Sequence, residues 1–594
     1  MKPRKLGSLL LWLLAAVVVT VTCRMASTRT PNNHQPIRQA KHFSRVEREP
    51  SAHLVETALR KADFPQALSA TERAALRQPI LTPSGVTILP DHSLLVEDIT
   101  VVEDKNLTWD QCLNGGAGGG TQTGEWTFNE LMLAVAGTTD NNPQPAEQML
   151  MDLLYNFGNP MLQIGSFTDK ARPDAEGFFN AWPPDPNLPN GCTNPFTGVH
   201  NTQCLSLKSS PVHLNAIVNR IDIGQNGGSD RAGMLRFVFG VSLGLNPDQQ
   251  FVVCPQNSNG QSANDQPFNI ILEYNVPSTN IVTGQPITAQ SWASAWQALS
   301  GDCLPVFTST CAQNTFDPAL NNNIVQLVVA KGAGGPNAPN GSALADLRTN
   351  EAELSGQSFV WEMRQFQLGQ QPTPNILVQT GLSQTPDLSF DFADDDCTFS
   401  NQDPNNHPPG CSNIGGEVEN LVAGNQTSIE NGTFTAPPAV QAASAINLTD
   451  YWDRSPSMIN NQNLYTPRVI FAGSPQFKNG QTGAPDPYGG IDGTCNGCHG
   501  VETNTGFRQV FNRISGTGND QPSALSPFLV GSSGTLQSPG CEVVQDPVYG
   551  SFNNTFGDIL RRVNCMNTIL GSTPGSDVQC NGAGMLPQTN GTCP

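Results

Sequence analysis

The stretch VHLNAIVNRIDI (residues 212–223), followed by MLRFVFGV (residues 234–241), carries the strongest fold signal in this chain of 594 residues. Both segments are rich in β-branched and large apolar residues, and a loop with several glycines (224–231) joins them. This arrangement predicts two strands connected like a hairpin. The segment FNIILEY (268–274) predicts a further strand.

Apolar residues recur at helical spacing in several other segments. These segments are 55–77, 126–157, 289–299, 347–366, 503–513 and 555–570. Segment 86–102 alternates more like strands. Trp292 and Trp296 stand four residues apart and fall on one helix face, where such a pair is more typical of a core than of a cofactor site. Together these patterns predict an α+β body of about 400 residues, long enough to bury its own core.

A Cys-x-x-Cys-His motif stands near the C-terminus, at Cys495, Cys498 and His499. In c-type haem attachment each of two such thiols bonds one vinyl group, and the histidine binds the iron from below. The motif therefore predicts one covalent haem c, with His499 as the proximal iron ligand. The alternatives are an ordinary disulfide, half of a zinc site, or a redox-active Cys-x-x-Cys that happens to precede a histidine.

The sixth iron ligand is less well defined by the sequence. No histidine follows His499, so methionine is the natural candidate. Met585, in a loop before Leu-Pro, is the favoured distal ligand. Met566 is the runner-up, on a predicted helix where core packing is the default role, and Met458 is a third candidate. A five-coordinate haem, which could bind a small ligand or support peroxide chemistry, stays open.

Of the histidines upstream, His213 lies on a predicted strand. We interpret it as a satisfied, half-buried side chain rather than a metal ligand.

Residues 1–23 predict a signal peptide. Three basic residues precede the apolar run 9–21, whose one polar residue is Thr20. A membrane-spanning helix needs about 20 apolar residues, so this run is short for a permanent anchor and cleavage is predicted. The chain is therefore expected to be exported to the periplasm, the cell surface or the medium.

Cys23 raises a second possibility at the end of this segment, the lipid anchor of a bacterial lipoprotein. Thr20 and Thr22 occupy positions where such signals usually carry Leu and Gly or Ala. We therefore expect membrane association only if Cys23 is lipidated.

The cysteine content fits an oxidising compartment. The chain has 15 cysteines, and without Cys23 and the two motif cysteines enough remain for six disulfides. Three close pairs could close short loops, namely Cys192/Cys204, Cys303/Cys311 and Cys397/Cys411. Four more could link the last part of the chain, namely Cys541, Cys565, Cys580 and Cys593. The sequence leaves the connectivity open.

The composition argues against some partners. The formal net charge is −20, charged residues make up 13%, and there are 56 glycines and 47 prolines. Because no basic patch is present to neutralise phosphates, nucleic acid is disfavoured as a partner. Adhesion to a membrane surface through basic residues is disfavoured for the same reason.

These signals divide the chain into five parts. They are the signal peptide (1–23), a polar leader (24–50), an α+β domain of unknown function (51–400), an Asn-, Gly- and Pro-rich linker (401–445) and a cytochrome c-like haem domain (446–594). The expected fold class is α+β, with a large disulfide-containing mixed body followed by a small, mostly helical domain.

The haem motif and its surroundings resemble a group of uncharacterised exported cytochrome c-like proteins of myxobacteria and related bacteria. The resemblance is carried near the motif by residues 495–503, Phe507, Arg513, Leu525, Ser526, Phe528, Leu529, Asp546, Pro547, Phe556, Asp558, Arg561 and Arg562. Upstream it is carried by residues 214–220, 268–274 and 348–351. It covers most of the mature chain and implies haem attachment at Cys495, Cys498 and His499, but no particular activity.

Three functions follow as hypotheses. The leading one is an exported monohaem c-type cytochrome that passes electrons between the iron and a redox partner protein or a small-molecule donor or acceptor. The second is a haem-dependent oxidoreductase whose N-terminal body binds a substrate, although the sequence has no nucleophile elbow, zinc-protease motif or dinucleotide fingerprint. The third is a haem-free, disulfide-rich surface protein. Electron transfer is favoured over catalysis.

Overall fold

A computed structural model describes two parts of the chain, residues 80–383 and 508–572, with gaps in both. The gaps are 82–84, 116–123, 159–162, 165–166, 169–180, 194–198, 200–201, 224–231, 246–250, 255–267, 305–306, 354–359, 370–375, 514–521, 527–528, 530–541, 546–552 and 557. The predicted signal peptide, leader, helix at 55–77 and linker at 401–445 all lie outside the described residues.

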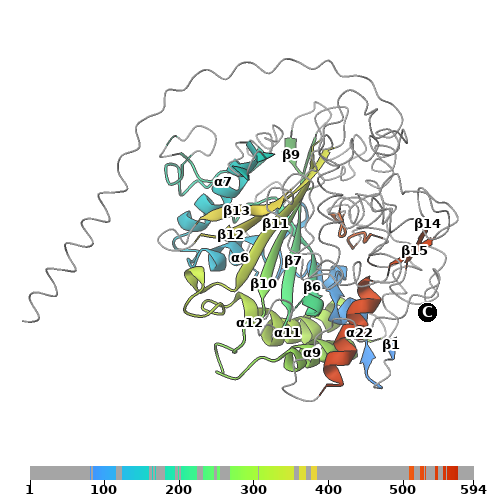
Figure 1. Cartoon of the computed structure of the whole chain (residues 1–594). Coiled ribbons are helices and arrows are strands. Elements are labelled where there is room, and N and C mark those ends of the chain that lie inside the picture. The colour runs from blue at the N-terminus through green and yellow to red at the C-terminus, as the bar shows by residue number, and fades with distance from the viewer. Residues whose placement is uncertain are drawn as a thin grey trace, which may run out of the picture. The chain divides into compact units, whose positions relative to one another are not determined.

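A seven-stranded sheet, antiparallel throughout, forms the centre of the described part (Figure 1). Its strand order is β13-β12-β11-β10-β7-β6-β3. The strands are β3 (Leu95–Val96), β6 (Val212–Arg220), β7 (Met234–Val241), β10 (Phe268–Asn275), β11 (Leu344–Glu353), β12 (Val360–Leu368) and β13 (Leu377–Ser383). Each strand pairs with its neighbour in chain order, so the sheet is a meander. Short antiparallel pairs lie outside it: β1 (Ile80–Leu81) with β2 (Thr87–Ile88), β4 (Gln163–Ile164) with β5 (Phe167–Thr168), and β8 (Leu243–Leu245) with β9 (Phe251–Val253).

One face of the sheet is apolar and packs against helices. Along β10, Phe268 and its alternate residues point to this face, because side chains alternate along a strand. Phe268 lies 5.5 Å from Phe157, between ring centroids, and Phe239 of β7 lies 5.5 Å from Phe128. Phe128 and Phe157 belong to the helices α6 (Phe128–Val135) and α7 (Gln144–Gly158), which therefore cover this face.

The helix α9 (Ala289–Ala298) confirms the prediction for segment 289–299. It begins at a capping box, in which the Thr288 hydroxyl accepts from the Ser291 backbone N–H and the Ser291 side chain bonds back. Trp292 and Trp296 are fully buried, with ring centroids 6.1 Å apart. The pair is part of the core, as the sequence indicated.

The other α-helices between residues 80 and 383 are short or irregular. They are α4 (Pro90–Ser93), α5 (Ile99–Val102), α10 (Ser309–Cys311), α11 (Asp317–Leu320) and α12 (Gln326–Val329). Wide π turns at Ala312–Phe316 and Asn321–Val325 join the last three into one irregular helical segment. Segment 86–102, predicted as strands, alternates instead between the short strands β2 and β3 and the helices α4 and α5.

The opposite face of the sheet is polar. Side chains that share this face include Asn269 and Glu273 of β10, Arg236 of β7, and Arg348 and Asn350 of β11, as the strand register shows. Asn269 and Glu273 are nevertheless fully buried. A polar face that is shielded from water needs hydrogen-bonding partners, and residues near the C-terminus supply some of them.

The C-terminal residues contribute one long helix and a short strand pair. The helix α22 (Asp558–Leu570) matches most of the predicted helix at 555–570, and β14 (Glu542–Gln545) pairs with β15 (Asn553–Phe556). Ile559, Val563 and Met566 of α22 are buried in the same hydrophobic cluster as the sheet. Figure 1 shows α22 beside α9.

Two helix predictions are wrong. Segment 347–366 contains strands β11 and β12, and its helical spacing is overridden by pairing along both strands, such as Leu347 opposite Phe366. In segment 503–513 the described residues 508–513 form no helix, and Val510 makes a β-bridge with Leu525. In both cases tertiary pairing outweighs local periodicity.

Three disulfides join described cysteines. Cys192–Cys204 and Cys303–Cys311 confirm two of the predicted short loops. Cys112–Cys254, with a sequence separation of 142, was not predicted. Cys565 on α22 is disulfide-bonded as well.

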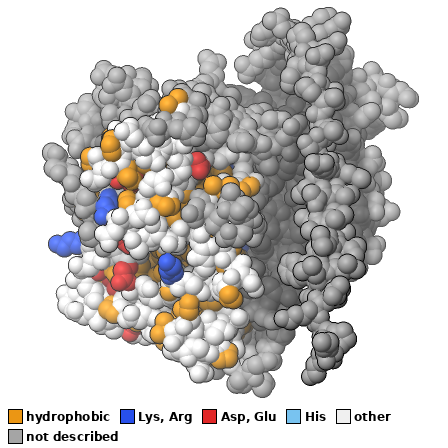
Figure 2. All heavy atoms as spheres, turned by 90° about the vertical axis from the view of Figure 1, so that its left-hand side faces the viewer, with side chains coloured by type: hydrophobic (Ala, Val, Ile, Leu, Met, Phe, Trp, Pro, Cys, Tyr) orange, Lys and Arg blue, Asp and Glu red, His pale blue; other side chains and the backbone are white. Residues whose placement is uncertain are grey.

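One face of the described part carries few charged side chains. On the face in Figure 2 the Lys, Arg, Asp and Glu side chains are sparse, and apolar atoms occur in small groups. This agrees with a composition of 13% charged residues. Within the described ranges, no helix is both long and apolar enough to cross a membrane.

Candidate functional sites

The predicted haem-attachment residues Cys495, Cys498 and His499 lie outside the described residues, as do the candidate distal ligands Met585 and Met458. Met566 is described and fully buried on α22. It packs in the core, which is the default role that its helix predicted.

A bulge in β6 forms the first site. The pairing of β6 with β7 shifts between Leu214 and Ala216, so Asn215 has no direct partner on β7. The side chain and carbonyl of Asn215 are therefore available to another segment of the chain. The described residues 508–513 and 522–526 supply that segment, and the first of them stands nine residues after His499.

Asn512 and Ser523 bind to this bulge. Asn215 Nδ2 donates to Asn512 Oδ1 over 3.2 Å, and Asn269 Nδ2 of β10, on the other side of β7, donates to the same oxygen over 3.0 Å. The Ser523 hydroxyl donates to the Asn215 carbonyl over 3.3 Å. We call Leu214, Asn215, Asn269, Asn512, Arg513 and Ser523 the docking site.

Arg513 holds the centre of the docking site. Its side chain has no exposed surface, and its Nε donates to the Leu214 carbonyl over 3.0 Å. Its two terminal nitrogens pair with Glu103 and with Asp110, the latter 2.7 Å from Arg513 Nη2. A buried guanidinium thus binds two carboxylates and a carbonyl, which is the geometry that arginine favours.

Gly240 makes room for this contact. A Cβ atom at Gly240 would lie 2.5 Å from Asn512 Oδ1 and 2.8 Å from Asn215 Nδ2. We therefore expect Gly240→Ala to lower the free energy of unfolding by about 1–3 kcal/mol through overpacking. Chemical unfolding checks this, with Gly301→Ala as the control, because a Cβ at Gly301 meets nothing within 4 Å. Equal denaturant midpoints for Gly240→Ala and Gly301→Ala would contradict this expectation.

His213 lies next to the docking site and has a structural role. It is fully buried, and its Nδ1 lies 2.5 Å from Ser242 Oγ. Burial lowers the pKa of His213 to about 4, so the ring is neutral at pH 7. The residue is fully buried rather than half-buried, and only one ring nitrogen is satisfied, since the buried Nε2 has no hydrogen-bond partner among the described residues.

Four arginines surround two carboxylates on and beside the polar face. Arg220 binds Asp222 through two hydrogen bonds of 2.9 Å, and Arg562 of α22 approaches the same carboxylate to 4.0 Å. On the sheet, Glu273 Oε1 lies 2.7 Å from Arg236 Nε, and Glu273 Oε2 lies 3.3 Å from Arg348 Nε. The first group ties α22 to the end of β6, and the second links β7, β10 and β11 across their strands.

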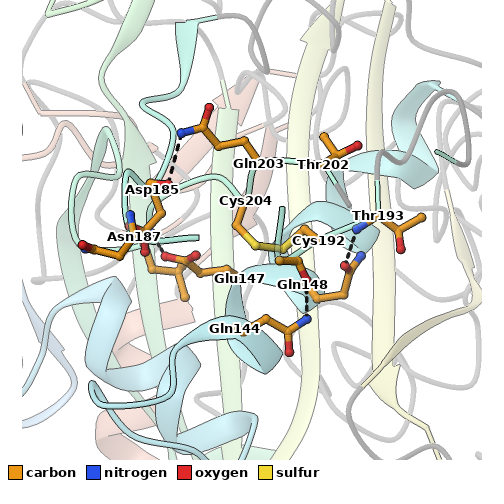
Figure 3. The surroundings of a disulfide bond; sticks show 12 residues. Gln144, Glu147, Gln148, Asp185, Asn187, Cys192, Thr193, Thr202, Gln203 and Cys204 are labelled. Carbon is orange, nitrogen blue, oxygen red and sulfur yellow. Dashed lines mark hydrogen bonds between the residues drawn. A yellow bond between two sulfur atoms is a disulfide. The ribbon is translucent and has the colours of Figure 1, made fainter. Parts of the chain in front are cut away.

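The disulfide Cys192–Cys204 lies in a third polar site, shown in Figure 3. Three side chains of α7, at spacings of three and four residues, face the loop that carries this disulfide. Gln144 Nε2 donates to the Gly191 carbonyl, Glu147 Oε1 accepts from the Leu207 N–H, and Gln148 Oε1 accepts from the Thr193 N–H. Helix α7 therefore holds the loop through polar contacts on one face.

Sequence reasoning missed Arg513, Asp110 and Glu147 as site residues. Asp110 and Glu147 are isolated acids in segments without a motif, and their role depends on partners distant in the chain. Arg513 did appear among the residues that carry the family resemblance, and so did residues 214–220. Because Arg513 and residues 214–220 both belong to the set on which the resemblance rests, that shared membership is the one signal in the sequence that could have indicated a contact between them.

The described residues contain no group of three or more His, Cys, Asp or Glu side chains placed to hold a metal ion. Comparisons with protein-family models, with curated proteins and with solved structures found no match.

Proposed function

We propose that this chain is an exported monohaem c-type cytochrome that transfers electrons. One observation carries the proposal, the pentapeptide Cys495-Asn-Gly-Cys498-His499. Two thiolates at this spacing suit the two vinyl groups of one haem, and the adjacent histidine suits the proximal iron position. Segment 446–594 would then act as a cytochrome c-like unit, with a redox protein or a small electron donor or acceptor as its partner.

The predicted export supports the proposal. Segment 1–23 has the pattern of a signal peptide, and disulfides in the described part suit an oxidising compartment. In bacteria haem c is attached outside the cytoplasm, so attachment would require this route. The mature protein would be periplasmic, surface-bound or secreted, with membrane association only through a lipidated Cys23.

The docking site supports the proposal only by limiting how far the motif can lie from the sheet. Arg513 is buried in the docking site, Arg508 is buried as well, and His499 precedes Arg508 by nine residues. An extended chain spans at most about 3.6 Å per residue, which limits the distance from His499 to Arg508 to roughly 32 Å. The motif would therefore stay close to the large N-terminal body, which would support the haem unit.

For the distal iron position we propose Met585. Met566 is less suitable because it is fully buried among core side chains. Methionine and histidine together give a low-spin iron whose potential depends on the axial ligand and on haem burial. The residues of this chain would bind the haem and exclude water from it, and the iron would change only its oxidation state.

The test is an optical spectrum of the full chain, exported together with haem-maturation machinery. We expect a sharp α-band after reduction by dithionite, and haem that stays attached in denaturant. Cys495→Ser combined with Cys498→Ser should abolish covalent haem, because no thiols would remain to bond the vinyl groups. His499→Ala should abolish the low-spin spectrum.

His407→Ala, in the predicted linker, is the matched control for His499→Ala, and Met458→Ala, at the third candidate ligand, is the control that should leave the spectrum unchanged if Met585 binds the iron. Neither control should change the spectrum, whereas Met585→Ala should remove the sulfur-to-iron band of the oxidised form. A wild-type protein that carries no haem after correct maturation would disprove the proposed function.

A further inference from the structure

We propose that the disulfide Cys303–Cys311 is a redox-active site that exchanges with an external dithiol, whereas Cys192–Cys204 is structural. The dithiol would reduce the bond, and the strained backbone at Cys303 would then relax. This inference concerns described helices and loops alone and does not depend on haem.

The backbone of Cys303 has a conformation that disfavours any residue other than glycine. Its φ angle is +59°, in the left-handed region. Asp302 before it has φ −84° and ψ 146°. The two residues thus fit the centre of a type II turn, whose third residue is normally glycine. A residue with a Cβ atom is disfavoured there by a factor of about five to thirty.

Left-handed backbone is rare outside glycine in the described part of the chain. It occurs there at three residues, Cys254, Cys303 and Asn340. Asparagine tolerates this conformation because its short polar side chain can form local hydrogen bonds, and cysteine lacks that advantage. Both cysteines in this group are disulfide-bonded. We therefore infer that the covalent bond holds Cys303 in this conformation.

The loop closed by Cys303–Cys311 is short and open to solvent. Its sequence separation of 8 is the shortest among the three disulfides that join described cysteines. Leu304 is 52% exposed, and residues 308–310 are exposed as well. Thiol–disulfide exchange needs access to one of the two sulfur atoms. Cys311 is the more accessible end of this bond, because it is partly exposed and Cys303 is only 9% exposed.

The disulfide Cys192–Cys204, drawn in Figure 3, has the opposite features. Cys192 and Cys204 are 1% and 0% exposed, and neither has a positive φ. Cys192 exchanges two backbone hydrogen bonds with Thr202, of 2.7 and 2.9 Å, and the Cys204 N–H donates to the Leu188 carbonyl over 3.1 Å. This bond has no backbone strain to release and is shielded from reagents, so it should stay closed.

Cys254 also has a positive φ, of 52°, but its disulfide with Cys112 should be held closed more firmly. Closing a loop of 142 residues removes more chain entropy from the unfolded state than closing a loop of 8. The stabilisation that a bond gives to the fold equals the stabilisation that the fold gives to the bond. Opening Cys303–Cys311 therefore costs the fold least, and the strain at Cys303 lowers this cost further.

The exchange would take two balanced steps. A thiolate of the external dithiol attacks Sγ of Cys311, forms a mixed disulfide there and expels the Cys303 thiolate, which takes up a proton. The second thiol of the dithiol, as its thiolate, then closes on the first and releases Cys311, which is protonated in turn. The dithiol is oxidised to its own disulfide by two electrons, and the two cysteines are reduced by the same two.

Reduction would loosen a loop that covers a buried aromatic group. Phe307 lies between the two cysteines of this loop and stacks on His92, with ring centroids 4.2 Å apart. It also packs edge-on against Phe316, with centroids 5.0 Å apart. Because the disulfide fixes both ends of the loop, its redox state would set how firmly Phe307 covers His92.

The first measurement is a redox titration of the full chain at pH 7 in mixtures of reduced and oxidised dithiothreitol. Free thiols are alkylated after an acid quench and located by peptide mapping. We expect Cys303 and Cys311 to be alkylated together, at a ratio of reduced to oxidised dithiothreitol about tenfold lower than Cys192 and Cys204 require. Tenfold corresponds to about 30 mV. If Cys192–Cys204 opens at the same ratio or at a lower one, the inference is wrong.

The second measurement tests what holds residue 303 in the left-handed region. Two variants that lack the disulfide, Cys303→Ala/Cys311→Ala and Cys303→Gly/Cys311→Ala, are compared by chemical unfolding. The glycine variant should be no more stable than the alanine variant, because the backbone has relaxed in both. A glycine variant with a folding equilibrium constant about five to thirty times larger would show that the rest of the fold imposes this conformation. That result would overturn the inference.

Asn340→Ala and Asn340→Gly are the matched control pair. Asn340 has a φ of 55° without a disulfide, and both variants lose the hydrogen bond from its Nδ2 to the Val135 carbonyl. Glycine should be the more stable of these two by about fivefold or more, because the fold keeps this position left-handed. If a variant at residue 303 fails to fold, the titration of the wild type is the deciding result.

Discussion

Replacing Arg513 by methionine is expected to lower the free energy of unfolding by about 3–5 kcal/mol, the cost of leaving buried charges without their partner. Arg513 is fully buried and binds Glu103, Asp110 and the Leu214 carbonyl. Asp110 is only 1% exposed and cannot recover this loss by binding water. Methionine fills much of the volume but supplies no charge. Denaturant unfolding followed by circular dichroism measures the change.

Lys208→Met is the matched control for Arg513→Met. Lys208 also pairs with an aspartate, at 3.1 Å, but the side chains of Lys208 and Asp140 are 38% and 46% exposed. Exposed ion pairs contribute about 0–1 kcal/mol, so this variant should change little. Adding Asp110→Asn to Arg513→Met should recover part of the stability, because it removes one of the stranded charges. If Arg513→Met costs no more than Lys208→Met, the docking site does not hold the C-terminal segment on the sheet.

Removing the Cys112–Cys254 disulfide, by replacing both cysteines with alanine, is expected to cost about 4–5 kcal/mol. The bond closes a loop of 142 residues, and the chain entropy that a disulfide removes from the unfolded state grows with loop length. This loop contains β6 and β7, so its closure also restrains the pair of strands that precedes β10. Denaturant midpoints of the oxidised proteins measure the effect.

The double variant Cys303→Ala/Cys311→Ala is the control, because that disulfide closes a loop of only 8 residues. The same entropy argument gives about 2.5 kcal/mol for it, roughly half of the cost expected for the long loop. Peptide mapping should verify that the other disulfides stay as they are. The contrary result is that removal of the Cys112–Cys254 disulfide lowers the free energy of unfolding no more than removal of Cys303–Cys311 does. That result would show that Cys112 and Cys254 are already held together by other contacts.

Much of the sheet could be predicted from short segments of the sequence. Residues 212–220, 234–241 and 268–275 are strands as expected, because their side chains satisfy a local pattern of apolar and β-branched residues. The helices α6, α7 and α9 follow from the same kind of local pattern. Two of the disulfides, each spanning a short loop, could be predicted because their cysteines are close in sequence.

The sites could not be predicted in the same way, because each depends on contacts between distant residues. The carboxylate of Asp110 acquires its partner more than 400 positions later, at Arg513. The contact of Asn512 with Asn215 and Asn269 likewise requires the finished fold. Segment 347–366 shows the same limit for secondary structure, since its helical spacing was outweighed by strand pairing.

The sequence by itself determined the α+β class, the main strands and the helices α6, α7, α9 and α22, and it predicts a haem at Cys495, Cys498 and His499. These depend on side-chain order along a short stretch of chain. Only the tertiary structure decided that the segment after the haem motif binds to the bulge of β6, and which acids and arginines are buried together. Burial sets the strength of an interaction between charges, and burial is a property of the folded chain rather than of any one segment.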